Sequence, residues 1–225
     1  MDLRIARAEL AAPREGMDAL AEFYGGALAL GCRQGRDVLT VTAGPAELVF
    51  VAADGSPFHH FALLVPGDRF DAALNWLGAA TSVLDARSFD FWDARAAYVH
   101  DPAGNIVELI AHRGEAEDGA TGPFSGAELA GISEVGIVGP DLAAAAAALE
   151  RELGLELWSG SVDDDASGLG FVGRKAHTLI LAAPGRGWLP TGRPAEVHPV
   201  AVTIAGGDRT GEVVLPGGRV SRVAN

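Results

Sequence analysis

The chain has 225 residues, of which 48% are hydrophobic and 21% charged, and a formal net charge of -13 at pH 7. An acidic surface repels phosphate backbones and anionic headgroups, so we expect neither nucleic acid nor a membrane as a partner. A single cysteine excludes an intrachain disulfide and a thiolate metal cluster. The opening residues lack the apolar run of a signal peptide. These features predict a cytoplasmic globular protein.

The first half of the chain shows one order of elements twice. Residues 3–13 alternate in polarity and end at Pro13, which is typical of a strand. Met17, Leu20 and Tyr24 follow at helical spacing, and two glycines end this helix. The same order begins again at residue 58. We therefore expect strands at 3–13, 37–44, 46–53, 58–66, 81–86, 94–100 and 105–111, and helices at 14–28 and 67–80.

Residues 114–130 are rich in glycine, alanine and acids without periodicity, so they are predicted to be a linker. The order then restarts, with Asp141 as the expected N-cap of a helix that Gly154 ends. The expected strands are 131–140, 155–160, 169–173, 177–183, 198–206, 210–218 and 219–223, and the helix is 142–153. The fourth copy is degenerate because it has no helix.

The repeat predicts an α+β fold of tandem β-α-β-β-β units. We expect one domain at residues 1–113, the linker at 114–130, and a second, incomplete domain at 131–225.

Two motifs carry a resemblance to a known superfamily. "DPAGNIVELI" (101–110) and "FYGGALAL" (23–30) resemble sequences of the vicinal oxygen chelate superfamily, which includes glyoxalase I, extradiol dioxygenases and bleomycin-resistance proteins. In this superfamily two units pair to form a cup-shaped mixed sheet around a metal or ligand site. The resemblance implies the same cups here, in a bacterial subgroup of unknown activity.

The resemblance also implies a metal site. Glu108 stands between Val107 and Leu109 in a strand that is otherwise apolar, at the place of a superfamily metal ligand. His60 stands at another ligand position, and strand parity puts each of these two side chains on a face of its strand that can line one cavity. Glu47 matches a further ligand position. The implied cofactor is one divalent ion, Fe, Mn, Ni, Co or Zn, with no organic cofactor.

Arg7 occupies a position where other members carry a ligand, and an arginine cannot bind a metal. Glu9 has the same parity and is a reserve ligand. Arg7 therefore separates two hypotheses. If it points into the cup and pairs with Glu108, the metal hypothesis fails; if it points away, the cavity is open to an ion.

The favoured hypothesis is a metal-dependent enzyme acting on a small substrate with vicinal oxygens, in a lyase- or isomerase-like reaction, with Glu108 or Glu9 moving the proton. A triad of two histidines and one carboxylate is absent, which disfavours an extradiol dioxygenase. The alternative is a metal-free binding protein of the bleomycin-resistance type. The predicted substrate-binding residues are Arg7, Phe91, Trp92 and Tyr98. The predicted partner is a small molecule, and the chain is expected to be a monomer or homodimer.

Residues 184–196 form a segment with Trp188 and two arginines, Arg186 and Arg193. Either arginine has the chemistry to bind a substrate carboxylate through two hydrogen bonds. Because the segment joins the third and fourth units, we favour its interpretation as a stiff connector whose Trp188 fills a gap between the halves.

Overall fold

The computed structural model describes residues 3–163 and 168–224. Short 3-10 or π-helical turns extend several helices and strands. The helices are α1 (Met17–Ala21), α2 (Phe70–Ala80) and α3 (Leu142–Ala148). The strands of the first two units are β1 (Arg4–Pro13), β2 (Cys32–Gln34), β3 (Val38–Ala43), β4 (Ala46–Ala53), β5 (His60–Val65), β6 (Asp85–Phe89), β7 (Ala94–His100) and β8 (Ile106–His112). The later strands are β9 (Gly131–Val138), β10 (Leu157–Gly160), β11 (Leu169–Arg174), β12 (His177–Ala182), β13 (Gly187–Trp188), β14 (Arg193–Pro194), β15 (Val200–Ala205), β16 (Gly211–Leu215) and β17 (Gly218–Val223).

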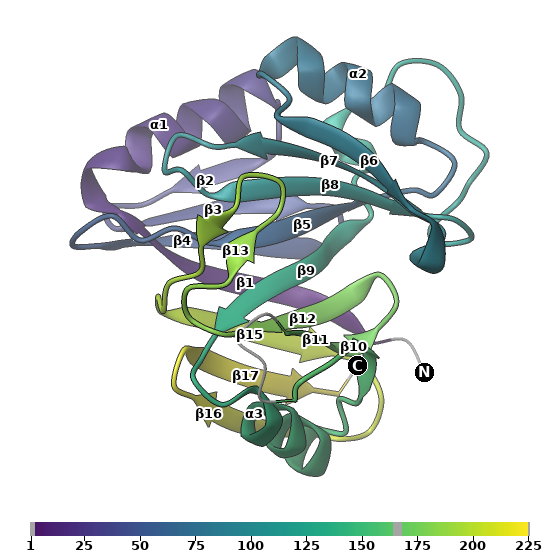
Figure 1. Cartoon of the computed structure of the whole chain (residues 1–225). Coiled ribbons are helices and arrows are strands. Elements are labelled where there is room, and N and C mark those ends of the chain that lie inside the picture. The colour runs from purple at the N-terminus through teal and green to yellow at the C-terminus, as the bar shows by residue number, and fades with distance from the viewer. Residues whose placement is uncertain (1–2, 164–167, 225) are drawn as a thin grey trace.

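The described residues form four successive groups of strands, three of which contain a helix. In each of the first three groups, a strand leads into the helix, and the last strand of the group pairs in parallel with the first. Other neighbours pair antiparallel, so the fold is α+β with mixed sheets. In the fourth group, five residues connect β15 to β16 without a helix. Helices α1 and α2 cover one end of the molecule, and α3 lies at the opposite end (Figure 1).

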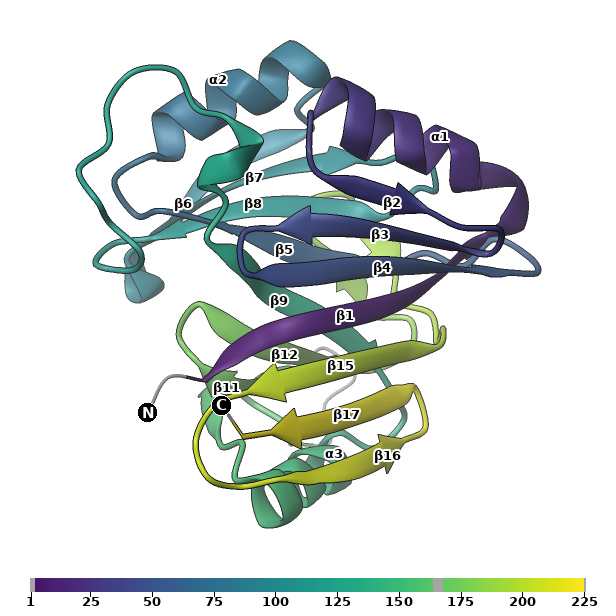
Figure 2. The ribbon, with the colours of Figure 1, turned by 180° about the vertical axis from the view of Figure 1, so that it is seen from behind.

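The first strands of the four units form the middle of the sheet. Strand β1 pairs antiparallel with β15, and β5 pairs antiparallel with β9. Unit one therefore joins unit four, and unit two joins unit three, while a single bridge between Ile5 and Ile132 links the two pairs. Figure 2 shows β1 beside β15 from the rear. This pairing crosses the division predicted at residues 114–130, so the proposed domain boundary stays a prediction.

Apolar side chains on the inner faces of the strands pack beneath the helices. Helix α2 buries Phe70, Ala73 and Leu77, at the spacing that one helix face requires. At the start of α3, the Asp141 side chain accepts a hydrogen bond from the backbone N–H of Ala144, as expected of an N-cap. No helix among the described residues is long and apolar enough to span a membrane.

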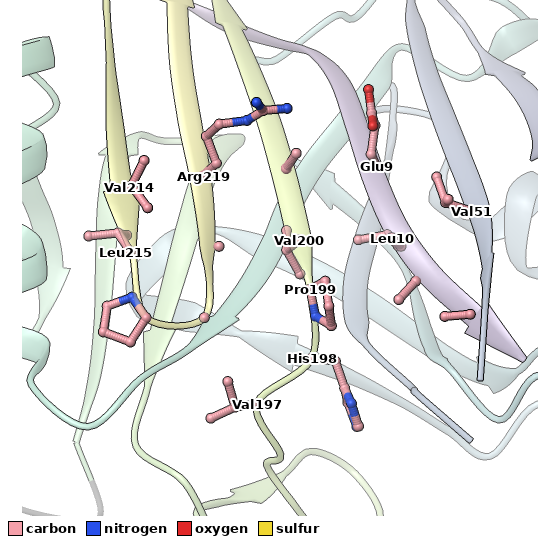
Figure 3. Close-up of a pocket in the computed structure, with 16 residues that line it drawn as sticks. Glu9, Leu10, Val51, Val197, His198, Pro199, Val200, Val214, Leu215 and Arg219 are labelled. Atoms are coloured by element: carbon pink, nitrogen blue, oxygen red, sulfur yellow. The ribbon is translucent and has the colours of Figure 1, made fainter. Parts of the chain in front are cut away.

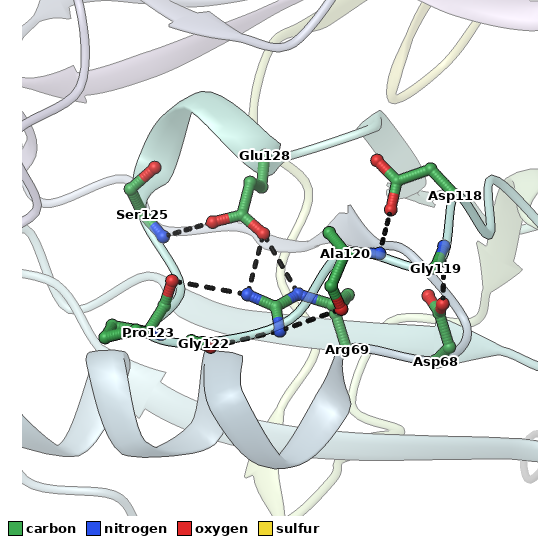
Figure 4. Close-up of polar contacts among 9 residues, drawn as sticks. All are labelled: Asp68, Arg69, Asp118, Gly119, Ala120, Gly122, Pro123, Ser125 and Glu128. Carbon is green, nitrogen blue, oxygen red and sulfur yellow. Dashed lines mark hydrogen bonds and ion pairs between the residues drawn. The ribbon is translucent and has the colours of Figure 1, made fainter.

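The segment predicted as a linker is held in place by Arg69, whose side chain is only 5% exposed. The guanidinium donates from Nε to Glu128 at 3.0 Å and also binds this carboxylate through Nη2 at 2.9 Å (Figure 4). Its remaining bonds go to the backbone carbonyls of Ala120, Gly122 and Pro123. A buried cation with all these acceptors fixes the path between units two and three. This path leads directly into β9, which completes the site described next.

Candidate metal site

Three strands bring three ligand residues together. His60 begins β5, and Ala62, two residues along on the same face, pairs with Glu108 of β8 on one side and Glu134 of β9 on the other. All three residues are buried, and one ligand atom from each lies within 4.8 Å of the other two. Two neighbouring units thus supply a histidine and two carboxylates to one point.

The hydrogen bonding of His60 leaves one ring nitrogen facing this point. Nδ1 lies 3.1 Å from the carbonyl of Ile106, an acceptor, so Nδ1 carries the proton and donates it. Nε2 then presents its lone pair, 3.4 Å from Oε2 of Glu108. Burial lowers the pKa of His60 to about 4, so the imidazole is neutral at pH 7. This is the tautomer and charge that a metal-binding histidine has.

The two carboxylates lie in an environment that disfavours their charge. Burial raises the pKa of Glu134 to about 7. Burial, and then the nearby charge of Glu134, raise the pKa of Glu108 well above its usual range, although the Tyr98 hydroxyl donates a hydrogen bond to it. Oε1 of Glu134 is buried and has no hydrogen-bond partner among the described residues. Among the described residues, neither carboxylate forms an ion pair with a lysine or an arginine, so the two carboxylates and the His60 lone pair face one point that fits a bound cation.

The three residues open into a cavity of about 480 Å³. This volume is in the range of sites for small organic molecules. Aromatic rings form much of the wall: Trp92 packs 4.5 Å from Phe171 and 4.7 Å from Phe91, centroid to centroid. The Trp92 indole donates to the Ser159 hydroxyl at 3.1 Å, which joins the wall of unit two to that of unit three. The site therefore combines a polar floor with an aromatic wall.

No family model and no curated protein matches the chain by sequence. Solved structures do match. Glyoxalase I from Zea mays superposes with a TM-score of 0.58 at 15% identity, over 99% of this chain and 92% of that one. A protein from Bacillus subtilis, described as a putative dioxygenase, superposes with a TM-score of 0.62 at 14% identity, over 97% of this chain and 84% of that one. The chain has the vicinal oxygen chelate fold.

Within this fold, His60 and Glu108 lie together as their strand parity predicts, and Phe91, Trp92 and Tyr98 line the cavity. Arg7 does not. Its guanidinium binds Glu9 at 2.9 Å and Glu47 at 2.5 Å, on the sheet formed by units one and four.

Glu47 therefore does not lie beside His60 as expected, and neither Glu47 nor Glu9 belongs to the group of His60, Glu108 and Glu134. Arg33 also binds Glu47, at 3.0 Å, and the side chains of Arg7, Glu9, Glu47 and Arg33 are all at least one third exposed. The suggested ion pair between Arg7 and Glu108 is not formed. Since Arg7 lies elsewhere, it leaves the cavity accessible to an ion.

Sequence reasoning missed Glu134. The available signal was the same as for Glu108: a carboxylate within the otherwise apolar strand "GISEVGIV", every residue of which is buried. What was missing was the pairing of unit two with unit three.

The "DPAG" motif has a structural role. Asp101 accepts hydrogen bonds from the backbone N–H groups of Ala103 and Asn105, both at 3.0 Å, and from the Tyr24 hydroxyl at 2.9 Å. Gly104 adopts a φ of 79°, which a side chain would disfavour. The motif therefore fixes the hairpin between β7 and β8, and with it the register that directs Glu108 inward.

Units one and four form a second cavity, of about 670 Å³, which Figure 3 shows. Glu9 and Arg219 lie at one end, and valines and prolines line much of the remainder. Among the described residues, the group of His60, Glu108 and Glu134 is the one cluster with the spacing of a metal site. The two cups of the fold therefore differ in chemistry.

Proposed function

We propose that this protein is a divalent-metal-dependent enzyme that acts on a small substrate with two adjacent oxygen atoms, in a lyase- or isomerase-type reaction. The observation that carries the proposal is the buried group of His60, Glu108 and Glu134, with its unpartnered carboxylate oxygen. One imidazole nitrogen and two carboxylates suit Fe, Mn, Ni, Co or Zn.

Two of the three ligand residues have a neighbour that orients them. The Ile106 carbonyl fixes the His60 ring, and Tyr98, which pairs with Glu108 across β7 and β8, favours the charged form of the Glu108 carboxylate. Such partners of metal ligands hold the ligand geometry and tune its basicity. Three protein ligands facing an open cavity leave room for substrate oxygens, which is the arrangement of a catalytic rather than a structural site.

When bound, a divalent ion supplies Lewis-acid stabilisation of negative charge on a substrate oxygen. The residues of the chain do the rest. The aromatic wall excludes water and positions the body of the substrate, and a glutamate of the site accepts or returns a proton. Glu9 is unsuited to this role, since it binds Arg7 on the sheet of the other cup.

Metal content of the purified, untagged protein tests the proposal, measured by inductively coupled plasma mass spectrometry after loading with each of the five ions and desalting. We expect about one equivalent in the wild type. Glu134→Gln and Glu108→Gln keep the side-chain size but remove a charged ligand. Loss of a residue that only supports a ligand weakens metal binding by about 10- to 100-fold, so each of these variants should weaken it more than that.

Glu47→Gln is the matched control. It also removes one carboxylate, but at a side chain bound to Arg7 and Arg33. It should retain the wild-type metal content. Loss of metal in this variant, or its retention in Glu134→Gln, would contradict the assignment of the ligands.

A metal-free binding protein is the second candidate, favoured by one observation. Burial raises the pKa of Glu108 well above its usual range, so a proton can take the place of a cation between the facing oxygen and nitrogen atoms. If none of the five ions binds, while the cavity still takes up aromatic compounds, this second function is correct.

A further inference from the structure

The hairpin of β13 and β14 closes one side of the cavity. Its Trp188 is 3% exposed and packs 5.0 Å from the His60 ring, centroid to centroid. Gly136 of β9 makes room for it, since a Cβ there would lie 3.0 Å from the Trp188 ring. The connector thus fills a gap, as the sequence indicated, and the gap it fills is the edge of the candidate metal site.

Arg186 lies two residues before Trp188, and both side chains line the cavity. Its backbone is fixed on both sides, because its N–H donates to Ala183 and its carbonyl accepts from Ala195 at 2.7 Å. The side chain is half-buried, and its Nη1 donates to the Gly187 carbonyl at 2.8 Å.

Arg193, the other arginine of the hairpin, has a different role. Its guanidinium stacks over Phe58, 3.3 Å from the ring centroid, and donates to the Gly104 carbonyl at 2.9 Å. It does not line the cavity. Of the two arginines that the sequence offered as anion ligands, the fold places Arg186 at the site.

We propose that Arg186 binds the carboxylate of the substrate, and that the substrates are small aromatic carboxylic acids with an oxygen on the carbon next to the carboxylate. This inference deepens the proposed function and rests on it for the position of the vicinal oxygens. A guanidinium stays protonated and matches the planar geometry of a carboxylate. The rings of Phe91, Trp92 and Phe171 provide the surface for a flat apolar body.

Binding of phenylglyoxylate and of its uncharged amide tests the inference. Quenching of the intrinsic tryptophan fluorescence reports occupancy, because Trp92 and Trp188 line the cavity, and calorimetry gives the dissociation constant. We expect the wild type to prefer the acid over the amide. Arg186→Met should weaken binding of the acid by about 10- to 100-fold, the range for a hydrogen bond to a charged group, and leave binding of the amide nearly unchanged.

Arg219→Met is the matched control, since it removes one positive charge from an exposed side chain of β17 that lies in the other cup. It should bind the acid as the wild type does. Pyruvate, which lacks the ring, should bind more weakly than phenylglyoxylate. No preference for the acid in the wild type, no detectable binding at about 10 mM, or an unchanged preference in Arg186→Met would overturn the inference.

The two proposals fail separately. Each titration is run with chelator and again after metal loading, and the metal content of Arg186→Met is measured alongside. If the protein takes up no metal but the acid preference depends on Arg186, the inference holds and the enzymatic function falls. If metal binds at His60, Glu108 and Glu134 but Arg186→Met changes nothing, the enzymatic function stands without this substrate class.

Discussion

His112 makes the folded protein sensitive to acid. It is the last residue of β8, and its side chain is fully buried. Burial, followed by the positive charges of Lys175 and His177, lowers the pKa of His112 from 6.5 to about 4. The unfolded chain therefore takes up a proton near pH 6.5, whereas the folded protein does so only near pH 4. The contribution of His112 to stability is complete above pH 6.5 and is lost as the pH falls toward 4.

The magnitude follows from the two pKa values. Since each pKa unit corresponds to about 1.36 kcal/mol, the full effect is about 3 kcal/mol. Most of it, about 2.5 kcal/mol, is lost by pH 4.5. This is a large share of the roughly 5 to 15 kcal/mol by which domains are stable.

Urea unfolding of the wild type and of His112→Gln at pH 7.5 and 4.5, with chelator present, measures this effect. Glutamine does not titrate, so its constant cost in the core cancels between the two pH values. We expect the free energy of unfolding to fall by about 2.5 kcal/mol more in the wild type than in the variant. Equal losses in both proteins, or an NMR titration of His112 in the folded state with a pKa near 6.5, would refute the reasoning.

Two further substitutions test the elements around the site. Arg69→Ala should lower the free energy of unfolding by about 3 to 5 kcal/mol, because it removes the donor of Glu128 Oε2 and of three backbone carbonyls. A stability within about 1 kcal/mol of wild type in chemical unfolding would show that the segment before β9 does not depend on this contact. Gly136→Ala should displace Trp188, cost about 1 to 3 kcal/mol and shift tryptophan emission to the red. Gly139→Ala, where an added Cβ meets nothing within 4 Å, should do neither, and identical spectra for all three proteins would contradict this packing argument.

The order of elements could be read from the sequence because it is encoded locally. Proline and glycine mark the ends of strands and helices, and the alternation of side chains fixes which residues share a face. His60 and Glu108 were found for the same reason, since β5 and β8 belong to one unit and pair in parallel. Their contact depends on parity within about fifty residues.

The choice of partner between units is not encoded locally. Each unit exposes the edge of its first strand, and nothing in the pattern of β5 distinguishes β9 from β1 as its neighbour. The structure pairs β5 with β9 and leaves β1 to β15. Glu134 joined the site through this pairing, and so did the hairpin that carries Arg186. Glu134, which meets His60 across two units, is therefore the site residue that the sequence did not place.

The register of β1 and β4 explains why Glu47 lies apart from the group of His60, Glu108 and Glu134. Pro13 ends β1 as Pro66 follows β5, so Glu9 corresponds to Ala62, four residues before the proline in each case. Ala62 pairs with Glu108 and Glu134, whereas Glu9 pairs with Val49 and Ala201.

The cup of units one and four therefore has valine and alanine at the positions where the cup of units two and three has its two carboxylates. Glu47 lies two residues before Val49, beside Arg7, and a shift of two residues preserves the face but moves the side chain by about 7 Å along the strand. At that distance from the ligand position, Glu47 forms an ion pair with Arg7 instead. In the cup of units one and four, Arg7 neutralises the charges of Glu9 and Glu47. In the cup of units two and three, no arginine or lysine pairs with Glu108 or Glu134 among the described residues, so the group of His60, Glu108 and Glu134 has the composition of a cation site.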